Sequence, residues 1–393
     1  MRVSLPEDLS TGNTIQYVML KAFKYRLYPT KTQMSQLNQH IGACRFVYNW
    51  GLERKIKSYE LSGKSVSRFD LHKEITHELK PEYPWLKDVN SQSLQASITN
   101  VESAFTKFFR EKTGFPNFKS KKNATQSFSV PQHYVVDFDT NKVKLPKIGW
   151  IKAALHRKFE GDMKTATVSM TKTGKYFISV LVDDGKEVPE SEPFDADTTV
   201  GVDVGITHFA TLSTGEKIEN PRYLKSSLGR LKVLQRRLSR TKKGSNNREK
   251  ARLKLAKQHE KIANQRRDFL HKTSHRLASE NQAIATETLN VKGMMKNHHL
   301  AMAISDVSWS EFFRQLKYKA NWYGKTVLTI GQFQPSTKIC SVCGTVVQGL
   351  TLADREWSCQ ECGTVHDRDI NTAINIKKFA LQDQNLITLG QRG

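Results

Sequence analysis

The chain has 393 residues, which is enough for about two or three domains with hydrophobic cores of their own. It contains 62 Lys and Arg against 38 Asp and Glu, a formal net charge of +24. Such a surplus attracts a polyanion, because binding releases the counterions of the polyanion, so nucleic acid is the expected partner. No apolar run approaches the roughly 18 residues that span a bilayer, and no secretory signal follows Met1. We therefore expect a soluble cytoplasmic protein and exclude a membrane partner.

The first half of the chain predicts a strand, a helical insertion and then further strands. Residues 1–18 are polar and lack periodicity, so we expect a disordered extension, whereas apolar residues nearly alternate from Met19 to Tyr28. Helical patterns cover residues 32–59 and 91–109. Strand signals return over residues 127–130, 134–138, 142–145, 165–170 and 175–183. This order predicts a small β-barrel over residues 19–195 with a helical insertion at about 30–125.

An acidic, proline-containing linker over residues 189–197 precedes a second domain, which we predict over residues 196–393. Strands over 199–204 and 208–212 form a hairpin that turns at Gly205, and a short strand over 283–286 ends at Glu287. Between them, leucines recur at helical spacings of three and four residues, and a turn over 241–247 leads to a second helical run. These patterns predict a helical hairpin over residues 221–280. The leucines of its first helix are Leu224, Leu228, Leu231, Leu234 and Leu238.

The predicted helical hairpin is the most basic part of the chain. Residues 221–276 contain 19 Lys and Arg but only 3 Asp and Glu. Charge runs are usually solvated helix faces, but intrahelical ion pairs need an acid three or four residues from each base, and so few acids cannot pair this many bases. We therefore expect the hairpin to face phosphate groups. The candidate nucleic-acid-binding residues are Arg230, Arg236, Arg237, Arg240, Lys242, Lys243, Arg266 and Arg267.

Four of the five cysteines form two Cys-x-x-Cys pairs, Cys340 with Cys343 and Cys359 with Cys362. Two close thiolate pairs across a short loop can complete a tetrahedral site for one zinc ion, and four thiolates leave no open position for a substrate. We therefore predict a structural zinc ribbon over about residues 335–366. The fifth cysteine, Cys44, lies among apolar residues at helical spacing and is predicted to be a buried thiol in a reducing compartment.

Three acids lie at the ends of predicted strands or helices in the second domain. Asp203 is a charged residue in an apolar strand, Glu287 ends another strand, and Asp369 lies in the first turn of a predicted helix. Local explanations exist: a turn beside Gly205 for Asp203, and a helix N-cap for Asp369. Together the three acids predict a site for paired divalent ions about 3.5–4 Å apart, because carboxylates hold magnesium, which activates water for phosphodiester hydrolysis.

Short motifs follow one another in a fixed order along the chain. They are Tyr25–Pro29, Phe46–Asn49, Gly114–Pro116, Lys144–Pro146, Gly201–Gly205, Glu287–Met294, Ser305–Trp309, Tyr318–Gly324 and Cys340–Asn371. In these motifs the chain resembles the TnpB family, the RNA-guided DNA endonucleases of bacterial insertion sequences, which are related to the type V CRISPR nucleases. The resemblance extends from about Met19 to the C-terminus, and the order and coverage of the motifs make it specific.

The resemblance implies a wedge-type β-barrel with a helical recognition insertion, followed by a RuvC-type nuclease domain with an RNase H-like sheet and an inserted zinc ribbon. In family terms Asp203, Glu287 and Asp369 are the catalytic carboxylates and bind magnesium. Asp367 competes with Asp369 for the last position, and Asp369 is preferred because it lies two residues before Asn371. A cytoplasmic bacterial protein that needs no protein oligomer is also implied.

The resemblance also implies the partners of the protein. A guide RNA made from the end of the mobile element pairs with one strand of double-stranded DNA beside a short flanking motif, and the single nuclease site cuts both strands in turn. Gln95, in the helical insertion, corresponds to a family residue that recognises this motif; a Gln can pair with adenine, and a surface Gln without a role is the alternative. Two other functions share these features, namely a transposase that joins DNA strands and a nuclease-dead RNA-guided regulator that only binds DNA.

Overall fold

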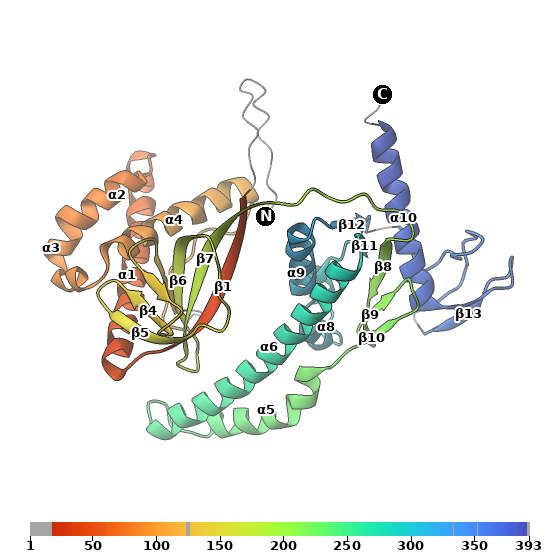
Figure 1. The fold of residues 1–393 in the computed structure, drawn as a ribbon. Helices are drawn as coiled ribbons and strands as arrows, with labels where there is room; N and C mark the ends of the chain where they lie inside the picture. The colour runs from red at the N-terminus through yellow and green to blue at the C-terminus, as the bar shows by residue number, and fades with distance from the viewer. Residues whose placement is uncertain (1–17, 123–125, 333, 352, 391–393) are drawn as a thin grey trace. The chain divides into compact units, whose positions relative to one another are not determined.

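The computed structural model describes residues 18–122, 126–332, 334–351 and 353–390. The chain divides between Glu187 and Val188 into two compact units, which are described separately below (Figure 1). The predicted disordered extension, apart from its last residue, lies outside the described residues, and the first strand begins at Val18. Among the described residues no helix is long and apolar enough to cross a membrane.

The first unit is built on a curled, antiparallel sheet that forms a half-barrel. Its strands are β1 (Val18–Tyr28), β2 (Gln126–Val130), β3 (Val135–Asp137), β4 (Lys142–Leu145), β5 (Gly149–Ala154), β6 (Asp162–Met170) and β7 (Tyr176–Glu187). The strand order is β2-β6-β7-β1-β5-β4-β3, and every neighbouring pair is antiparallel. Side chains alternate between core and surface, as in β7, where Ile178, Val180 and Val182 are buried. The predicted barrel is thus confirmed as a half-barrel, with β2 and β3 as its edges in the described part of the chain.

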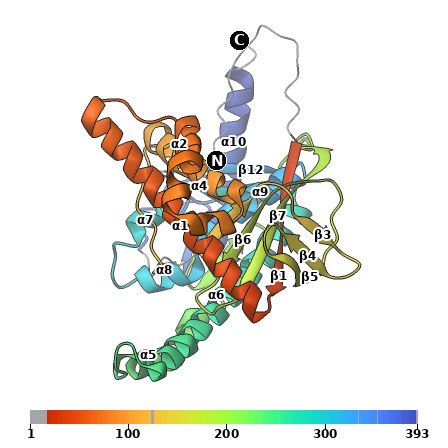
Figure 2. The same ribbon diagram turned by 90° about the vertical axis from the view of Figure 1, so that its left-hand side faces the viewer.

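The helical insertion lies between β1 and β2, as predicted (Figure 2). It contains α1 (Lys31–Ser62), α2 (Arg68–Glu74), a π-helical turn (Ile75–Leu79), α3 (Lys80–Glu82), a 3-10 turn (Pro84–Asp88) and α4 (Ser91–Glu111). Helix α1 begins at a capping box, in which the Thr30 hydroxyl accepts from the Gln33 amide and the Gln33 side chain accepts from the Thr30 amide. Leu37 of α1 and Leu94 of α4 belong to the same buried cluster as the strands, so the insertion and the half-barrel share one core.

The second unit contains a mixed five-stranded sheet. Its strands are β8 (Thr199–Val204), β9 (His208–Leu212), β10 (Lys217–Glu219), β11 (Ala283–Glu287) and β12 (Thr326–Ile330). The order is β10-β9-β8-β11-β12; neighbours among β8, β9 and β10 are antiparallel, whereas β11 runs parallel to both β8 and β12. The predicted hairpin at Gly205 and the predicted strand ending at Glu287 are both present.

The predicted helical hairpin is formed by α5 (Tyr223–Ser239) and α6 (Asn246–Glu280). Leu231 of α5 packs with Leu255 and Ile262 of α6 in a small cluster of its own. Ser245 begins α6, because its hydroxyl accepts from the Arg248 amide. The leucine spacing therefore predicted the seam between the two helices, and the charged residues lie outside it.

Helices cover both faces of the mixed sheet. Helix α7 (Val291–Met294) is short and precedes α8 (Ala301–Val307) and α9 (Trp309–Trp322). Residues of α6, α8 and α9 form one core with Val200 and Val202 of β8. Helix α10 (Arg368–Gly390) follows two short strands, β13 (Glu356–Ser358) and β14 (Val365–Asp367), and packs through Ile376 against Ala285 of β11. The sheet is therefore a middle layer, with α10 on one face and α6, α8 and α9 on the other.

Gly201 allows α10 to lie close to β8. A Cβ atom at this position would overlap the carbonyl oxygen of Ala373 and would lie 2.9 Å from Lys377 Cβ. Successive side chains of a strand point to opposite faces. Because Val200 and Val202 face the core on the other side, Asp203 shares the face of Gly201 and lies towards α10.

Gly201→Ala should destabilise the second unit by about 1–3 kcal/mol, because the new methyl group overlaps backbone that cannot move without shifting α10. Gly229→Ala is the matched control: this residue is an exposed helical glycine with no atom within 4 Å of an added Cβ, and it should gain about 0.5–1 kcal/mol. Urea unfolding of the purified protein measures both. A Gly201→Ala protein as stable as the original would contradict the close packing of α10.

Candidate functional site

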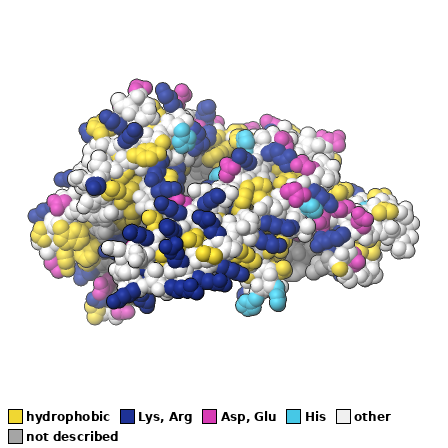
Figure 3. Space-filling view, turned by 90° about the horizontal axis from the view of Figure 1, so that it is seen from below, with side chains coloured by type: hydrophobic (Ala, Val, Ile, Leu, Met, Phe, Trp, Pro, Cys, Tyr) yellow, Lys and Arg dark blue, Asp and Glu magenta, His cyan; other side chains and the backbone are white. Residues whose placement is uncertain are grey.

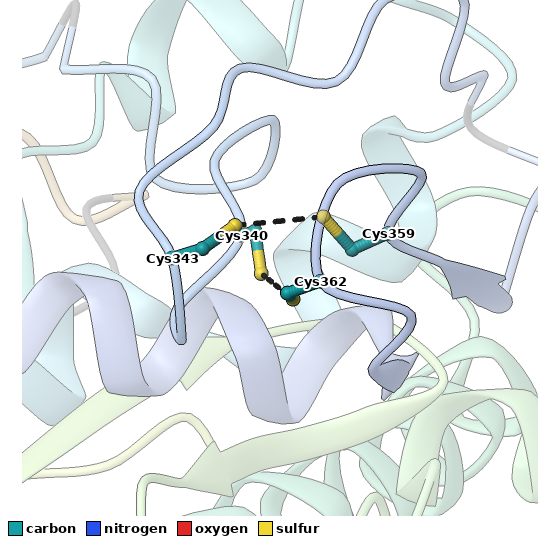
Figure 4. Close-up of side chains that lie close together, drawn as sticks. All are labelled: Cys340, Cys343, Cys359 and Cys362. Atoms are coloured by element: carbon teal, nitrogen blue, oxygen red, sulfur yellow. Dashed lines mark hydrogen bonds between the residues drawn. The ribbon is translucent and has the colours of Figure 1, made fainter.

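Two similar loops bring the four clustered cysteines together (Figure 4). Each has the sequence Cys-x-x-Cys-Gly-Thr, one beginning at Cys340 and the other at Cys359. In each loop the amide of the first Cys donates to the Thr carbonyl, at 3.0 and 2.9 Å, and the Gly amide donates to the carbonyl of the first Cys, at 2.9 Å in both. Gly344 and Gly363 have positive φ angles of 80° and 71°, a conformation that favours glycine. The sequence repeat therefore gives a repeated backbone geometry.

The arrangement of the cysteine sulfurs fits a zinc ion. All four sulfurs lie within 4.8 Å of one another. The Sγ–Sγ distance is 3.7 Å between Cys340 and Cys362 and 3.6 Å between Cys343 and Cys359. Tetrahedral zinc with Zn–S bonds of about 2.3 Å would place its sulfurs about 3.8 Å apart. Hydrogen bonds with Thr345 lower the pKa of Cys343 to about 6, which favours the thiolate that binds metal. Burial raises the pKa of Cys340 to about 11, so metal binding must release that proton.

Asp203, Glu287 and Asp369, here called the acidic cluster, lie on one face of the mixed sheet. Asp203 is near the end of β8 and Glu287 ends β11, and the parallel register of these strands makes the two acids neighbours. Glu287 shares the face of Ala285, which packs against Ile376 of α10. Strand β14 runs directly into α10, whose first turn holds Asp369. Three separate elements therefore supply the three carboxylates.

The carboxylates of the acidic cluster repel one another. Burial raises the pKa of Asp203 well above its usual value, and the charges of Glu287 and Asp369 raise it further. Arg355 and Arg368 partly compensate, with guanidinium nitrogens 3.6 and 3.4 Å from the Asp369 carboxylate. Among the described residues, the four cysteines alone form a tight group of three or more potential metal ligands, so the carboxylates of the acidic cluster are more widely spaced than the sulfurs. An oxygen-only set with excess negative charge fits a hard cation such as magnesium.

Asp367 has a structural role that distinguishes it from Asp369. Its carboxylate accepts from the amides of Asp369 and Ile370, both at 3.0 Å, so it is the N-cap of α10. It also lies 2.5 Å from Lys217 Nζ on β10. Burial alone would raise the pKa of Asp367, but the hydrogen bonds from Lys217 and from the two amides hold it below the usual value. Asp367 therefore caps the helix, and Asp369 is left to face the other acids.

The predicted cations of the helical hairpin are exposed, with one exception. Figure 3 shows Lys and Arg side chains gathered on the face where α5 and α6 lie. Arg266 is the exception, because its Nη2 lies 2.9 Å from Asp306, which also accepts from the amides of Leu224 and Lys225 at the start of α5. Arg266 thus joins α6 to α5 and α8 by way of a carboxylate. The exposed cations are Arg230, Arg236, Arg237, Arg240, Lys242, Lys243 and Arg267.

Three stretches of the chain match known family models. Residues 178–298 match the OrfB model described as "Probable transposase", and residues 309–376 match "Cas12f1-like, TNB domain", which includes the cysteine loops. Residues 19–64 match a model described as "Helix-turn-helix domain". In the structure this last stretch forms strand β1 and the single long helix α1 rather than two helices.

A protein of Streptomyces pristinaespiralis named "Putative RNA-guided DNA endonuclease" is 40% identical over 91% of this chain and 88% of its own length. The chain belongs to the TnpB family. Another relative in the TnpB family, InsQ of Escherichia coli K12, carries the same description and is 34% identical over 91% of each chain. The fold is shared with Cas12f1 in a complex with sgRNA and target DNA, with a TM-score of 0.55 at 14% identity over 92% of this chain and 99% of that one.

Four residues beside the acids of this TnpB protein were not predicted from the sequence. Lys217, Ser336, Arg355 and Arg368 each contact an acid in or next to the acidic cluster. Arg355 and Arg368 lie inside the recognised motif Cys340–Asn371, which indicated the zinc ribbon and Asp369 but no role for either arginine. Residue spacing carries no signal for the contacts of Lys217, Ser336 and Arg355, whose acids are distant along the chain. Arg368 is adjacent to Asp369 in the sequence, and its contact was missed all the same.

Cys340→Ser should reduce both zinc content and folding of the ribbon, because three thiolates cannot complete the tetrahedral site. Cys44→Ser is the matched control. Cys44 is buried in the first unit, and burial raises its pKa to about 12. The substitution should therefore leave the zinc content unchanged. Metal analysis of the two purified proteins gives the answer. Equal zinc content in Cys340→Ser and the original chain would rule out this site.

Asp203→Asn should raise the melting temperature in magnesium-free buffer at neutral pH. The folded pKa of Asp203 lies above the unfolded value, so its stabilising contribution exists at low pH and is lost as pH rises through the folded pKa. The difference between Asn and Asp should therefore grow with pH. Asp195→Asn is a control of opposite sign, because hydrogen bonds with Thr198 lower the pKa of Asp195. If the melting-temperature gain of Asp203→Asn shrank with rising pH, the pKa of Asp203 would not be raised in the folded protein.

Proposed function

We propose that this protein is a magnesium-dependent, RNA-guided DNA endonuclease that cleaves both DNA strands in one RuvC-type site. The observation that carries the proposal is the acidic cluster: three carboxylates from β8, β11 and α10 share one face of the mixed sheet, in a chain of the TnpB family. The sheet order, with three antiparallel strands followed by two parallel ones, agrees with the RNase H-like arrangement expected for such a domain.

The proposed magnesium ions would be held by Asp203, Glu287 and Asp369. When bound, they would activate water and stabilise the leaving oxygen of a phosphodiester. The chain itself holds the ligands in place. Asp367 caps α10 and so fixes the turn that carries Asp369, while Arg368 offsets part of the negative charge.

The helical hairpin is proposed to bind the phosphate backbone of the guide RNA and its target strand. A groove of about 520 Å³ runs between α5 and α6, and none of the described residues that line it is acidic. Binding there would depend on backbone charge rather than base identity, which leaves sequence selection to base pairing with the guide. The cations that line the groove are Arg230, Arg237, Lys254, Lys257 and Lys261.

Recognition of the flanking motif is assigned to the helical insertion. Gln95 lies exposed on α4. Its backbone carbonyl oxygen is 3.2 Å from His72 Nε2, so this contact leaves the side-chain amide available for a base edge. Strand transfer is the second candidate function, because residues 178–298 match a model described as "Probable transposase". A nuclease-dead regulator is disfavoured, since all three acids are present.

The test is guided DNA cleavage by protein purified from cells that also express the end of the mobile element. We expect a specific co-purifying RNA, magnesium-dependent cuts in targets that match it, and loss of cutting in Asp203→Ala with RNA-guided DNA binding intact. Sequencing identifies the co-purifying RNA, cleavage of a target library measures cutting, and a DNA-binding assay with the matched target measures binding. Cleavage should fall by several orders of magnitude, whereas binding should change less than about two-fold.

Two aspartates near the start of α10 provide the matched control. Asp369→Asn should abolish cutting, whereas Asp367→Asn should retain it, because Asn still caps a helix and loses only the pair with Lys217. Joined rather than cut DNA would favour the transposase, and guided binding without cuts would favour the regulator. Absence of a specific RNA would overturn both RNA-guided functions.

A further inference from the structure

Ser336 links the acidic cluster to the cysteine loops. Its side chain is buried, with 3% of the residue exposed, and its hydroxyl donates to Glu287 Oε1 at 2.5 Å. It is the only hydrogen-bond donor to the Glu287 carboxylate in the described chain. A short bond from a hydroxyl to a charged carboxylate is stronger than a bond between neutral groups and fixes the direction of the acceptor.

Ser336 begins a connecting segment, residues 336–341, whose last two residues open the first cysteine loop. Two buried asparagines of α10 hold this segment. The Asn375 amide donates to the carbonyls of Ser336 and Ile339, at 2.8 and 2.7 Å. The Asn371 amide donates to the same Ile339 carbonyl at 2.8 Å, and its oxygen accepts from the Ser341 amide at 2.8 Å. The connecting segment is therefore attached to α10 at both of its ends.

Helix α10 thus joins the two candidate metal sites. It carries Asp369 itself, and through the connecting segment it fixes both Ser336, which holds Glu287, and Cys340, a proposed zinc ligand. Both asparagine side chains are almost inaccessible, and buried amides exchange partners at a high cost, so the connection is rigid. The order of contacts is cysteine loop, connecting segment, Ser336 and Glu287.

We infer that Ser336 is a positioning residue, which orients Glu287 for divalent-ion binding and couples that orientation to the cysteine loops. This inference rests on the proposed function of the acidic cluster as a magnesium site. Outer partners of metal ligands generally change affinity by about 10-fold to 100-fold when removed. Ser336 lies 49 residues from Glu287 along the chain, so the contact depends on the folded ribbon.

The test compares Ser336→Ala with Ser336→Thr, which keeps the hydroxyl, and with Ser341→Ala. Ser341 is a buried serine of the same segment, and its hydrogen bonds in the described chain are made by its backbone amide and carbonyl. Manganese binding to the full-length, zinc-loaded protein is measured by electron paramagnetic resonance, with Asp203→Ala as the zero. The half-saturating magnesium concentration for guided cleavage is measured separately.

We expect Ser336→Ala to weaken manganese binding and to raise the half-saturating magnesium concentration, each about 10-fold, with full zinc content and unchanged RNA binding. Ser336→Thr and Ser341→Ala should stay within about two-fold of the original protein. A merely structural role would change zinc content or the melting temperature but not metal affinity. Asn375→Ala, which frees the Ser336 carbonyl, should produce the same direction of change and serves if Ser336→Ala does not fold.

The two measurements separate the inference from the proposed function. If the original protein cuts no DNA, the nuclease proposal fails, while manganese binding still tests Ser336. If the original protein cuts DNA and Ser336→Ala has the same manganese affinity and magnesium dependence, the positioning role is wrong. Weaker manganese binding in Ser341→Ala equal to that in Ser336→Ala would also overturn it, because the hydroxyl bond to Glu287 would then not be the cause.

Discussion

The close contact between α10 and β8 is the constraint on which the second unit depends. Only a residue without a Cβ allows the Ala373 carbonyl to lie where it does, and glycine occupies position 201. Asp203 follows two residues later on the same face, and Asp369 lies one turn before Ala373 on the helix. The packing of backbone against backbone therefore sets the distance between two charged side chains. No local interaction of either acid could do so.

The acidic cluster lowers the stability of the folded chain when its carboxylates are ionised. The acidic cluster places three carboxylates close together on the α10 face, where burial and mutual repulsion oppose the ionised form of Asp203. The charge of Arg368 reduces that opposition, and Arg355 adds a second positive charge 3.6 Å from the Asp369 carboxylate. The fold thus tolerates local strain at one site, and such strain commonly marks the place where a protein binds or reacts.

Sequence reasoning succeeded where a short-range pattern carried the information. The two Cys-x-x-Cys pairs predicted the four-sulfur site, and leucine spacing predicted the pairing of α5 with α6. It failed for β5, because Ala153 and Ala154 give a weak strand signal, and for residues 68–88, whose elements are each less than about two turns long.

The candidate site was predicted only in part for a similar reason. A carboxylate at the end of an apolar strand is visible in the sequence, so Asp203 and Glu287 could be named. Arg266 was expected to face phosphate, but the structure pairs it with Asp306, 40 residues away. Ser336 has no periodic or compositional signal at all. Contacts of this kind depend on the three-dimensional path of the chain, which spacing does not encode.

The helical hairpin has a consequence for how the protein responds to its solution. Ordinary protein surfaces alternate charges, so added salt weakens their ion pairs. Here the cations that line the groove between α5 and α6 have no acid among them, and they repel one another. Salt should screen this repulsion, since the Debye length falls to about 8 Å at physiological ionic strength. The isolated protein should therefore become more stable, and not less, as ionic strength rises. A bound polyanion should relieve the same repulsion between the cations of the groove.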